Sequence, residues 1–179
     1  FLAIVRVSSL AVPGGFFPQA SLLMLFMGLL SVFIAAVFVQ KTNNYKRMLA
    51  YSSVENMGIM MIGVACGPVG LFGALLHGCG HSLIKSGLFL TAGNILHRYG
   101  SKQISAVSGL MKADHVSGWL WGTGLLFITA APPSVLFVSE FTIVKELIGS
   151  GRIWAAVLML LLLSAVLYGM VFSSFKMLA

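Results

Sequence analysis

The sequence has 179 residues, of which 59% are hydrophobic and only 8% are charged. Soluble domains carry about 25% charged residues, so a soluble globular protein is excluded and lipid must cover much of the folded chain. The net charge of +7 does not indicate nucleic-acid binding, because the basic residues lie mainly between apolar runs rather than in one patch.

The apolar runs are long and continuous, which selects the type of membrane fold. A transmembrane β-barrel is built from short segments of alternating polarity, whereas helices that cross a bilayer need about 20 consecutive apolar residues. We therefore predict an all-α, polytopic transmembrane helix bundle in which residues 1–179 form a single domain. Because Phe1 stands inside an apolar run without a leading basic region, we expect an internal fragment of a longer protein.

Five apolar segments are predicted after an opening stretch at residues 1–10, with a turn at Pro13, Gly14, Gly15 and Pro18 before the first of them. In chain order they are residues 19–39, 48–65, 69–96, 119–147 and 153–175. The last contains few polar residues and is expected to be a lipid-facing scaffold.

The loops between these segments predict the topology. Residues 41–47 and 98–114 are basic loops separated by two spans, and Lys176 follows after two more. The positive-inside rule therefore places all three on one side, which we expect to be the cytoplasmic side. Asn44 is positioned to cap the helix that follows the first basic loop.

Tryptophans occur close to the predicted ends of two segments. Trp119 and Trp121 begin the fourth, and Trp154 begins the fifth. Indole side chains favour the headgroup region of a bilayer, so we expect all three to lie there.

The third segment contains the most informative polar residues. His77, His81 and Lys85 are four residues apart, so they share one helix face along about 12 Å of axis. A lysine inside a span costs at least about 2.5 kcal/mol, and a lysine that can lose its proton can also transfer one. Histidine titrates near neutrality, and bridging waters would have to connect side chains about 6 Å apart. The alternative is that Lys85 extends to an interface while the histidines bond neighbouring helices. Gly78, Cys79 and Gly80, between the histidines, are expected to loosen the helix.

A helix break is predicted at Pro132 and Pro133, because proline removes a backbone donor. Glu140 follows about two turns later, and broken helices at membrane depth mark ion and substrate paths. Glu140 therefore lies either beside such a path or at a helix end near the interface. Glu55, about two turns into the second segment, either pairs with a cation from another span or lies near the surface. We include both carboxylates with Lys85 and the histidines as candidates for a proton pathway.

Three motifs together resemble the antiporter-like membrane subunits of respiratory complex I, membrane-bound hydrogenases and multisubunit sodium/proton antiporters. They are residues 46–53 (KRMLAYSS), the H-x3-H-x3-K segment at 77–94, and residues 131–141 around the two prolines and Glu140. Residues 53–58 and 92–94 are most similar to the hydrogenase-4 component F branch of that family.

The resemblance implies a hydrophilic axis along which protons move, driven by redox chemistry in a neighbouring arm. It also implies that Lys85 is the central lysine, that His77 and His81 bridge it, and that Glu140 is the ionisable residue of the broken helix. The family's earlier glutamate–lysine pair would precede Phe1. Asn44 stands where many members have aspartate.

Three functions follow as hypotheses. The first is a proton-translocating subunit of a hydrogenase-4/formate hydrogenlyase-type or complex I-like oxidoreductase, and the second is a sodium/proton antiporter subunit without a redox partner. The third is an inactive membrane anchor, which the full set of ionisable residues disfavours. The sequence lacks nucleotide motifs, a catalytic triad and an iron–sulfur cysteine set. We therefore expect no cofactor, metal site or catalytic residue in this chain. Iron–sulfur clusters and a nickel–iron site or quinone are expected in partner subunits, within a multisubunit complex of a prokaryotic inner membrane.

Overall fold

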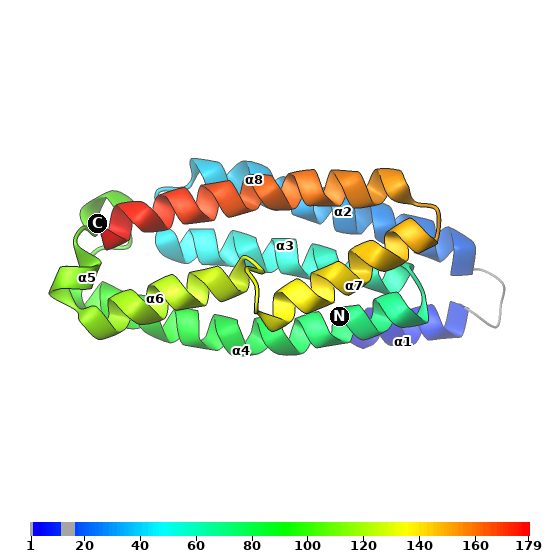
Figure 1. Ribbon diagram of the computed structural model, residues 1–179, viewed down its shortest axis with the longest axis horizontal. Helices are drawn as coiled ribbons and strands as arrows, with labels where there is room; N and C mark the ends of the chain where they lie inside the picture. The colour runs from blue at the N-terminus through cyan, green and yellow to red at the C-terminus, as the bar shows by residue number, and fades with distance from the viewer. Residues whose placement is uncertain (1, 12–16) are drawn as a thin grey trace.

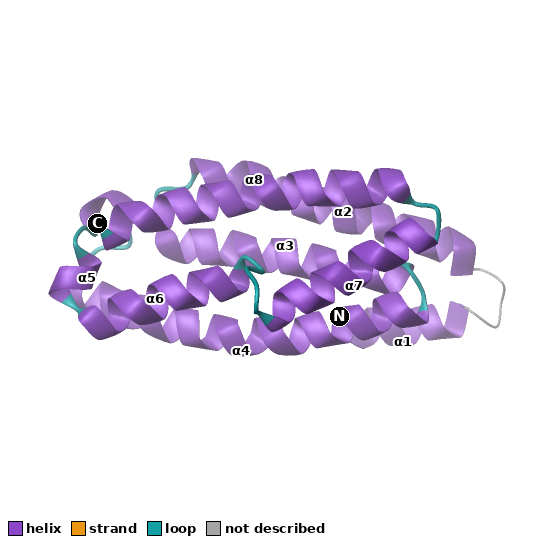
Figure 2. Ribbon diagram, in the orientation of Figure 1, coloured by secondary structure: helices purple, strands orange, loops and turns teal. Residues whose placement is uncertain are grey.

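The computed structural model describes residues 2–11 and 17–179, which form a bundle of long helices that run along one axis (Figure 1). Short loops join the helices (Figure 2). The helices are α1 (Leu2–Ala11), α2 (Phe17–Lys41), α3 (Tyr45–Ala65), α4 (Pro68–Tyr99), α5 (Leu110–Ala113), α6 (His115–Ile128), α7 (Val135–Gly149) and α8 (Ile153–Leu178), with a 3₁₀ turn, η1 (Ile104–Ala106). The all-α prediction is confirmed for this part of the chain.

The five predicted segments correspond to α2, α3, α4, the α6–α7 pair and α8. The predicted turn residues Pro13, Gly14 and Gly15 lie outside the described residues, and Pro18 is part of α2. Among the described helices, α2 from Pro18 onward, α3 and α8 are long and apolar enough to cross a membrane. Helix α4 carries more polar residues and α6 and α7 are each short, but α4 and the α6–α7 pair run alongside the others (Figure 1).

The prediction that the basic loops lie on the same side of the bundle is confirmed. The backbone N–H of Tyr45 donates to the carbonyl of Lys102 at 3.2 Å, and that of Ile104 donates to the carbonyl of Asn43 at 2.9 Å. The two loops therefore meet at one end of the bundle, where the C-terminus also lies (Figure 1). Asn44 caps α3 as predicted, because its side chain accepts from the backbone N–H of Arg47.

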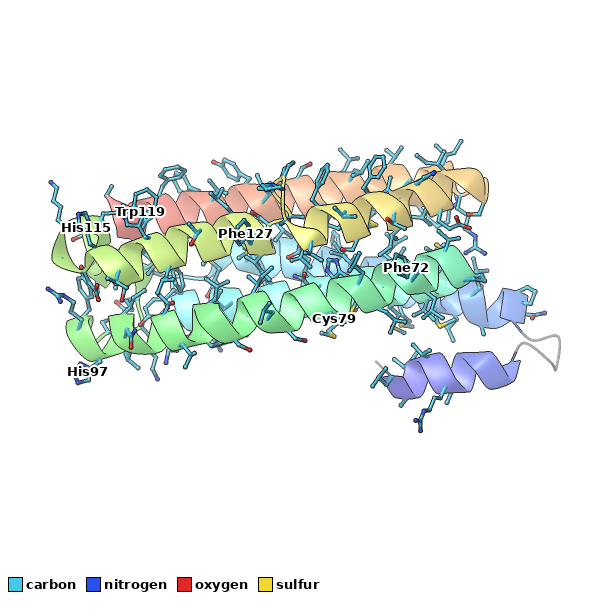
Figure 3. All side chains as sticks on the ribbon, turned by 60° about the horizontal axis from the view of Figure 1, so that its bottom comes forward. Phe72, Cys79, His97, His115, Trp119 and Phe127 are labelled. Atoms are coloured by element: carbon cyan, nitrogen blue, oxygen red, sulfur yellow. The ribbon has the colours of Figure 1, made fainter. Side chains whose placement is uncertain are left out.

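The same end of the bundle corrects one prediction about the tryptophans. Trp121 is 0% exposed and packs edge-on against Tyr45, with ring centroids 5.8 Å apart, so it belongs to the core rather than the headgroup region. Trp119 and Trp154 are 62% and 50% exposed, as an interfacial position requires. Trp119 lies near His115 at the start of α6, and His97 on α4 lies at the same end of the bundle (Figure 3). Helix α6 turns one inner face to the bundle, and Trp121 is on that face.

The opposite end of the bundle is tied together by Arg152, which precedes α8. Its guanidinium donates to the carbonyl of Ala65 at 3.1 Å and to the hydroxyl of Ser21 at 2.9 Å. Ser21 donates to the same carbonyl at 2.7 Å. The last carbonyls of a helix lack intrahelical partners. Arg152 and Ser21 supply hydrogen-bond donors to the Ala65 carbonyl at the end of α3, and so connect the ends of α2, α3 and α8.

Candidate functional site

The predicted polar face of α4 lies inside the bundle. His77, His81 and Lys85 are 0%, 5% and 6% exposed. The ammonium group of Lys85 donates to the carbonyl of Leu49 and to the hydroxyl of Ser52, both on α3. Lys85 therefore points into the bundle and does not extend to an interface, because the hydrogen bonds that offset its burial come from α3.

His77 joins three helices through hydrogen bonds to both ring nitrogens. Its Nδ1 lies 2.8 Å from the hydroxyl oxygen of Ser139 on α7, and its Nε2 lies 2.8 Å from Oδ1 of Asn56 on α3. The amide of Asn56 in turn donates to the backbone carbonyl of Ser52 at 2.6 Å, and the hydroxyl of Ser52 accepts from Lys85. Sequence reasoning missed Ser52, Asn56 and Ser139 as members of the site. The four-residue spacing of Ser52 and Asn56 is the signal that places them on one face of α3.

His81 lies one turn from His77 and one turn from Lys85. Its Nδ1 is buried and has no hydrogen-bond partner among the described residues. A buried polar nitrogen is normally satisfied by protein or by water, so His81 is suited to bind a water molecule between its two neighbours on α4.

The two candidate carboxylates, Glu55 and Glu140, line one cavity of about 210 Å³. Glu55 is only 7% exposed and lies within electrostatic range of Lys85 and Glu140. The walls of the cavity also include Thr129 and Ala130 from the break between α6 and α7. The remaining wall is formed by Phe137 and by the α8 residues Leu160, Leu163, Ser164 and Leu167. Helix α8, expected to be a lipid-facing scaffold, therefore also lines this cavity.

The predicted break between Ala131 and Ser134 is confirmed. Helix α6 ends at Ile128 and α7 begins at Val135, where the Ser134 hydroxyl accepts from the backbone N–H of Phe137. Ser134 is buried, whereas Pro132 and Pro133 are exposed. The arrangement fits their chemistry, because proline has no N–H that would be left unpaired on the outer face.

The glycines of α4 allow α7 to approach closely beside His77. A Cβ atom added at Gly73 would lie 3.0 Å from Cγ1 of Ile143, and one at Gly80 would lie 3.3 Å from Cγ1 of Val135. Both contacts are closer than ordinary carbon–carbon separations of about 3.5–4.0 Å. Helix α4 continues through Gly78 and Gly80 without interruption. These glycines permit helix contact.

The fold and the site together define a polytopic membrane protein with ionisable side chains buried in its helix bundle. Residues 1–167 match the family described as NADH:quinone oxidoreductase/Mrp antiporter, TM. The chain belongs to this family of antiporter-like membrane subunits, as its motifs suggested. It is therefore an integral membrane protein.

Individual relatives agree with this assignment. The chain is 37% identical over 148 residues to a hydrogenase-4 component F homolog of Methylacidiphilum infernorum, a match that covers 82% of this chain and 31% of the relative. It is 30% identical over 158 residues to formate hydrogenlyase subunit 3 of Escherichia coli, covering 81% of this chain and 26% of that protein. Among solved structures, respiratory complex I from Thermus thermophilus contains a chain with a TM-score of 0.83 and 28% identity, covering 90% of this chain and 34% of that one. The sequence thus spans about a third or less of each of these proteins.

Proposed function

We propose that this chain carries protons through the membrane as part of a hydrogenase-4/formate hydrogenlyase-type or complex I-like oxidoreductase. The observation that carries the proposal is Lys85, a titratable side chain that is 6% exposed and is held inside the bundle by Leu49 and Ser52. An ionisable group inside a transmembrane bundle is costly and typically marks an ion or proton path.

The histidines extend this path along α4. Successive members of the His77, His81 and Lys85 series are separated by one turn, about 6 Å along the axis, so direct transfer between them is too long. Bridging water completes the path, and the buried Nδ1 of His81 is available to bind it.

The carboxylates continue the path toward α7. Glu55 lies within electrostatic range of both Lys85 and Glu140, and the two carboxylates face one cavity. A proton released by Lys85 passes to Glu55 and then, through water in the cavity, to Glu140. The helix break beside the cavity supports this route, because irregular backbone at membrane depth is tolerated where it lines a polar space.

The redox chemistry belongs to partner subunits in this proposal. The relatives named above are a formate hydrogenlyase subunit, a hydrogenase-4 component and a complex I chain, and such assemblies combine membrane and peripheral subunits. We propose that iron–sulfur clusters and a nickel–iron site or quinone are bound by those partner subunits. The whole complex would then lie in a prokaryotic inner membrane.

The decisive experiment measures proton uptake by vesicles that contain the whole complex. Lys85→Met keeps the side-chain length but deletes the titration, so uptake per electron transferred should fall about 100-fold or more, as expected when a proton-transfer group is lost. Lys85→Arg should also lose proton uptake, because a guanidinium group stays protonated and cannot pass its proton on. Lys85→Met should still insert into the membrane, since it removes a charged group and so relieves an insertion cost.

A matched control is Lys102→Met, because the Lys102 side chain is exposed in the basic loop. This variant should retain normal uptake at the same expression level. Normal coupled uptake in Lys85→Met would sink the proposal and leave an inactive membrane anchor as the better description.

A sodium/proton antiporter subunit is the second candidate, and the cavity is the observation that favours it. Glu55, Glu140, Thr129 and Ser164 all contribute to its lining, and hard cations prefer oxygen ligands. Removal of sodium from both sides of the vesicle distinguishes the two. Proton uptake that persists without sodium supports the first function, whereas uptake that requires sodium supports the second.

A further inference from the structure

Ser139 occupies a position in the site that its sequence motif does not explain. Its hydroxyl oxygen lies 2.8 Å from Nδ1 of His77 and 2.8 Å from the carbonyl oxygen of Leu136, one turn earlier on α7. Ser139 is 0% exposed, and His77 is equally buried. A hydroxyl group has one proton to donate, so only one of these two contacts can receive it at a time.

The other side of the His77 ring shows which nitrogen carries the proton. The Nδ2 group of Asn56 donates to the carbonyl of Ser52 at 2.6 Å, which turns Oδ1 of Asn56 toward Nε2 of His77. The reverse amide orientation would place two oxygens 2.6 Å apart. Because an amide oxygen can only accept, Nε2 of His77 must be protonated in both the neutral and the charged ring.

We propose that Ser139 is a positioning residue for His77, with a hydroxyl that reverses its donor direction when Nδ1 gains or loses a proton. In the neutral ring, Nδ1 has a lone pair and the Ser139 hydroxyl donates to it. In the charged ring, Nδ1–H donates to the Ser139 oxygen, and the hydroxyl proton turns to the Leu136 carbonyl. The proton that Nδ1 gains comes from the bridging water of the proposed path. The single hydrogen bond of the neutral ring is replaced by two in the charged ring, and no heavy atom moves.

This arrangement would allow His77 to change charge in an apolar environment without an unpaired group in either state. A buried polar group that loses its partner destabilises the protein, and a relay group would meet that cost once in every proton transfer. The hydroxyl of Ser139 removes it from both states. The inference rests on the proposed function in one respect, since it assumes that His77 changes protonation during transport.

The first test is spectroscopic and does not depend on transport. Solid-state NMR of the whole complex in membranes, with ¹⁵N-histidine in this subunit and His77→Gln to assign the resonance, reports the tautomer and the hydrogen bond at Nδ1. Wild type should show neutral His77 with Nε2 protonated and Nδ1 hydrogen-bonded. Ser139→Ala should lose the hydrogen-bonded Nδ1 signature, and Ser139→Thr, which retains a hydroxyl, should restore it.

The second test is proton uptake by vesicles that contain the complex. Ser139→Ala should reduce coupled uptake roughly tenfold, the effect of one lost hydrogen bond in the rate-determining state, and Ser139→Thr should recover it. The matched control is Thr142→Val, which removes a hydroxyl one turn further along α7 that bonds only its own helix, at the carbonyl of Val138. Ser139→Cys provides the same comparison if Ser139→Ala does not assemble, because a thiol donates only weakly.

The outcomes separate this inference from the proposed function. An unchanged His77 resonance in Ser139→Ala, normal uptake in that variant, or equal loss in Thr142→Val would each overturn the role of Ser139. Normal uptake in Lys85→Met together with a changed His77 resonance in Ser139→Ala would instead refute the proton path and leave the assignment of the hydrogen bond intact.

Discussion

The contact between α4 and α7 can be perturbed at Gly73 without touching an ionisable group. A Cβ atom at this position would lie 3.0 Å from Cγ1 of Ile143 and 3.3 Å from the backbone oxygen of Ser139. Ordinary carbon–carbon contacts begin near 3.5 Å, so Gly73→Ala requires the side chain of Ile143 or the backbone of α7 to move by about 0.5 Å. A movement of α7 away from α4 by that distance would lengthen the 2.8 Å contact between His77 and Ser139 to about 3.3 Å, beyond the usual range for a hydrogen bond.

The expected free energies follow from two opposing effects. Alanine in place of glycine stabilises a helix by about 1 kcal/mol, whereas overpacking costs about 1–3 kcal/mol. Gly73→Ala should therefore lie between neutral and about 2 kcal/mol less stable than wild type. Gly93→Ala is the matched control on the same helix, because a Cβ atom there meets nothing within 4 Å. It should be about 1 kcal/mol more stable than wild type.

Thermal unfolding of the full-length subunit in detergent, followed by fluorescence, measures both variants against wild type. Proton uptake in vesicles should decrease in Gly73→Ala and remain normal in Gly93→Ala. If Gly73→Ala is as stable as Gly93→Ala and transports normally, then the close approach of α7 does not constrain the site and the reasoning is wrong.

Two further predictions concern the end of the bundle with the basic loops. Trp121→Ala should destabilise the subunit by about 3–5 kcal/mol, because the indole of Trp121 fills the core. Trp119→Ala, at a 62% exposed position, should change stability by about 0.5 kcal/mol or less. Thermal unfolding of both variants provides the comparison. The hydrogen bonds from Ser117 lower the pKa of the Asp114 carboxyl group below its ordinary value of 3.8. The stabilisation is therefore complete above that value and lost as the pH falls through the lowered pKa. Asp114→Asn should abolish this acid-side dependence in unfolding measured against pH, and an unchanged profile would contradict it.

Local sequence information was sufficient for the helices and their main interruption. Apolar runs of about 20 residues favour membrane helices, because lipid provides no partner for unpaired backbone groups. Asn44 was predicted as a cap, and the break at Pro132 and Pro133 was predicted because proline lacks a backbone donor. The inward position of Lys85 was one of two alternatives that the sequence left open, favoured by the cost of placing an ammonium group in lipid, and its burial in the structure decides between them.

The partners of those residues required the tertiary structure. Ser139 is 62 residues from His77 in the chain, and Asn56 is 21 residues from it. Helical periodicity states which residues share a face, but not which face of another helix lies opposite. That choice depends on how closely helices approach, and here glycines such as Gly73 allow α7 to reach His77.

The burial of Trp121 and the role of α8 in the cavity have the same origin. Composition considers each segment of the chain separately. It therefore predicts that Trp121 lies at the interface and that α8 faces lipid. Packing buries Trp121 against Tyr45 and places Ser164 in the lining of the cavity that Glu55 and Glu140 share. In a membrane protein the outside and the inside of the bundle are similarly apolar. The hydrophobic pattern of the chain therefore predicts that a helix crosses the bilayer, while only the packing of neighbouring helices decides which of its faces meets lipid.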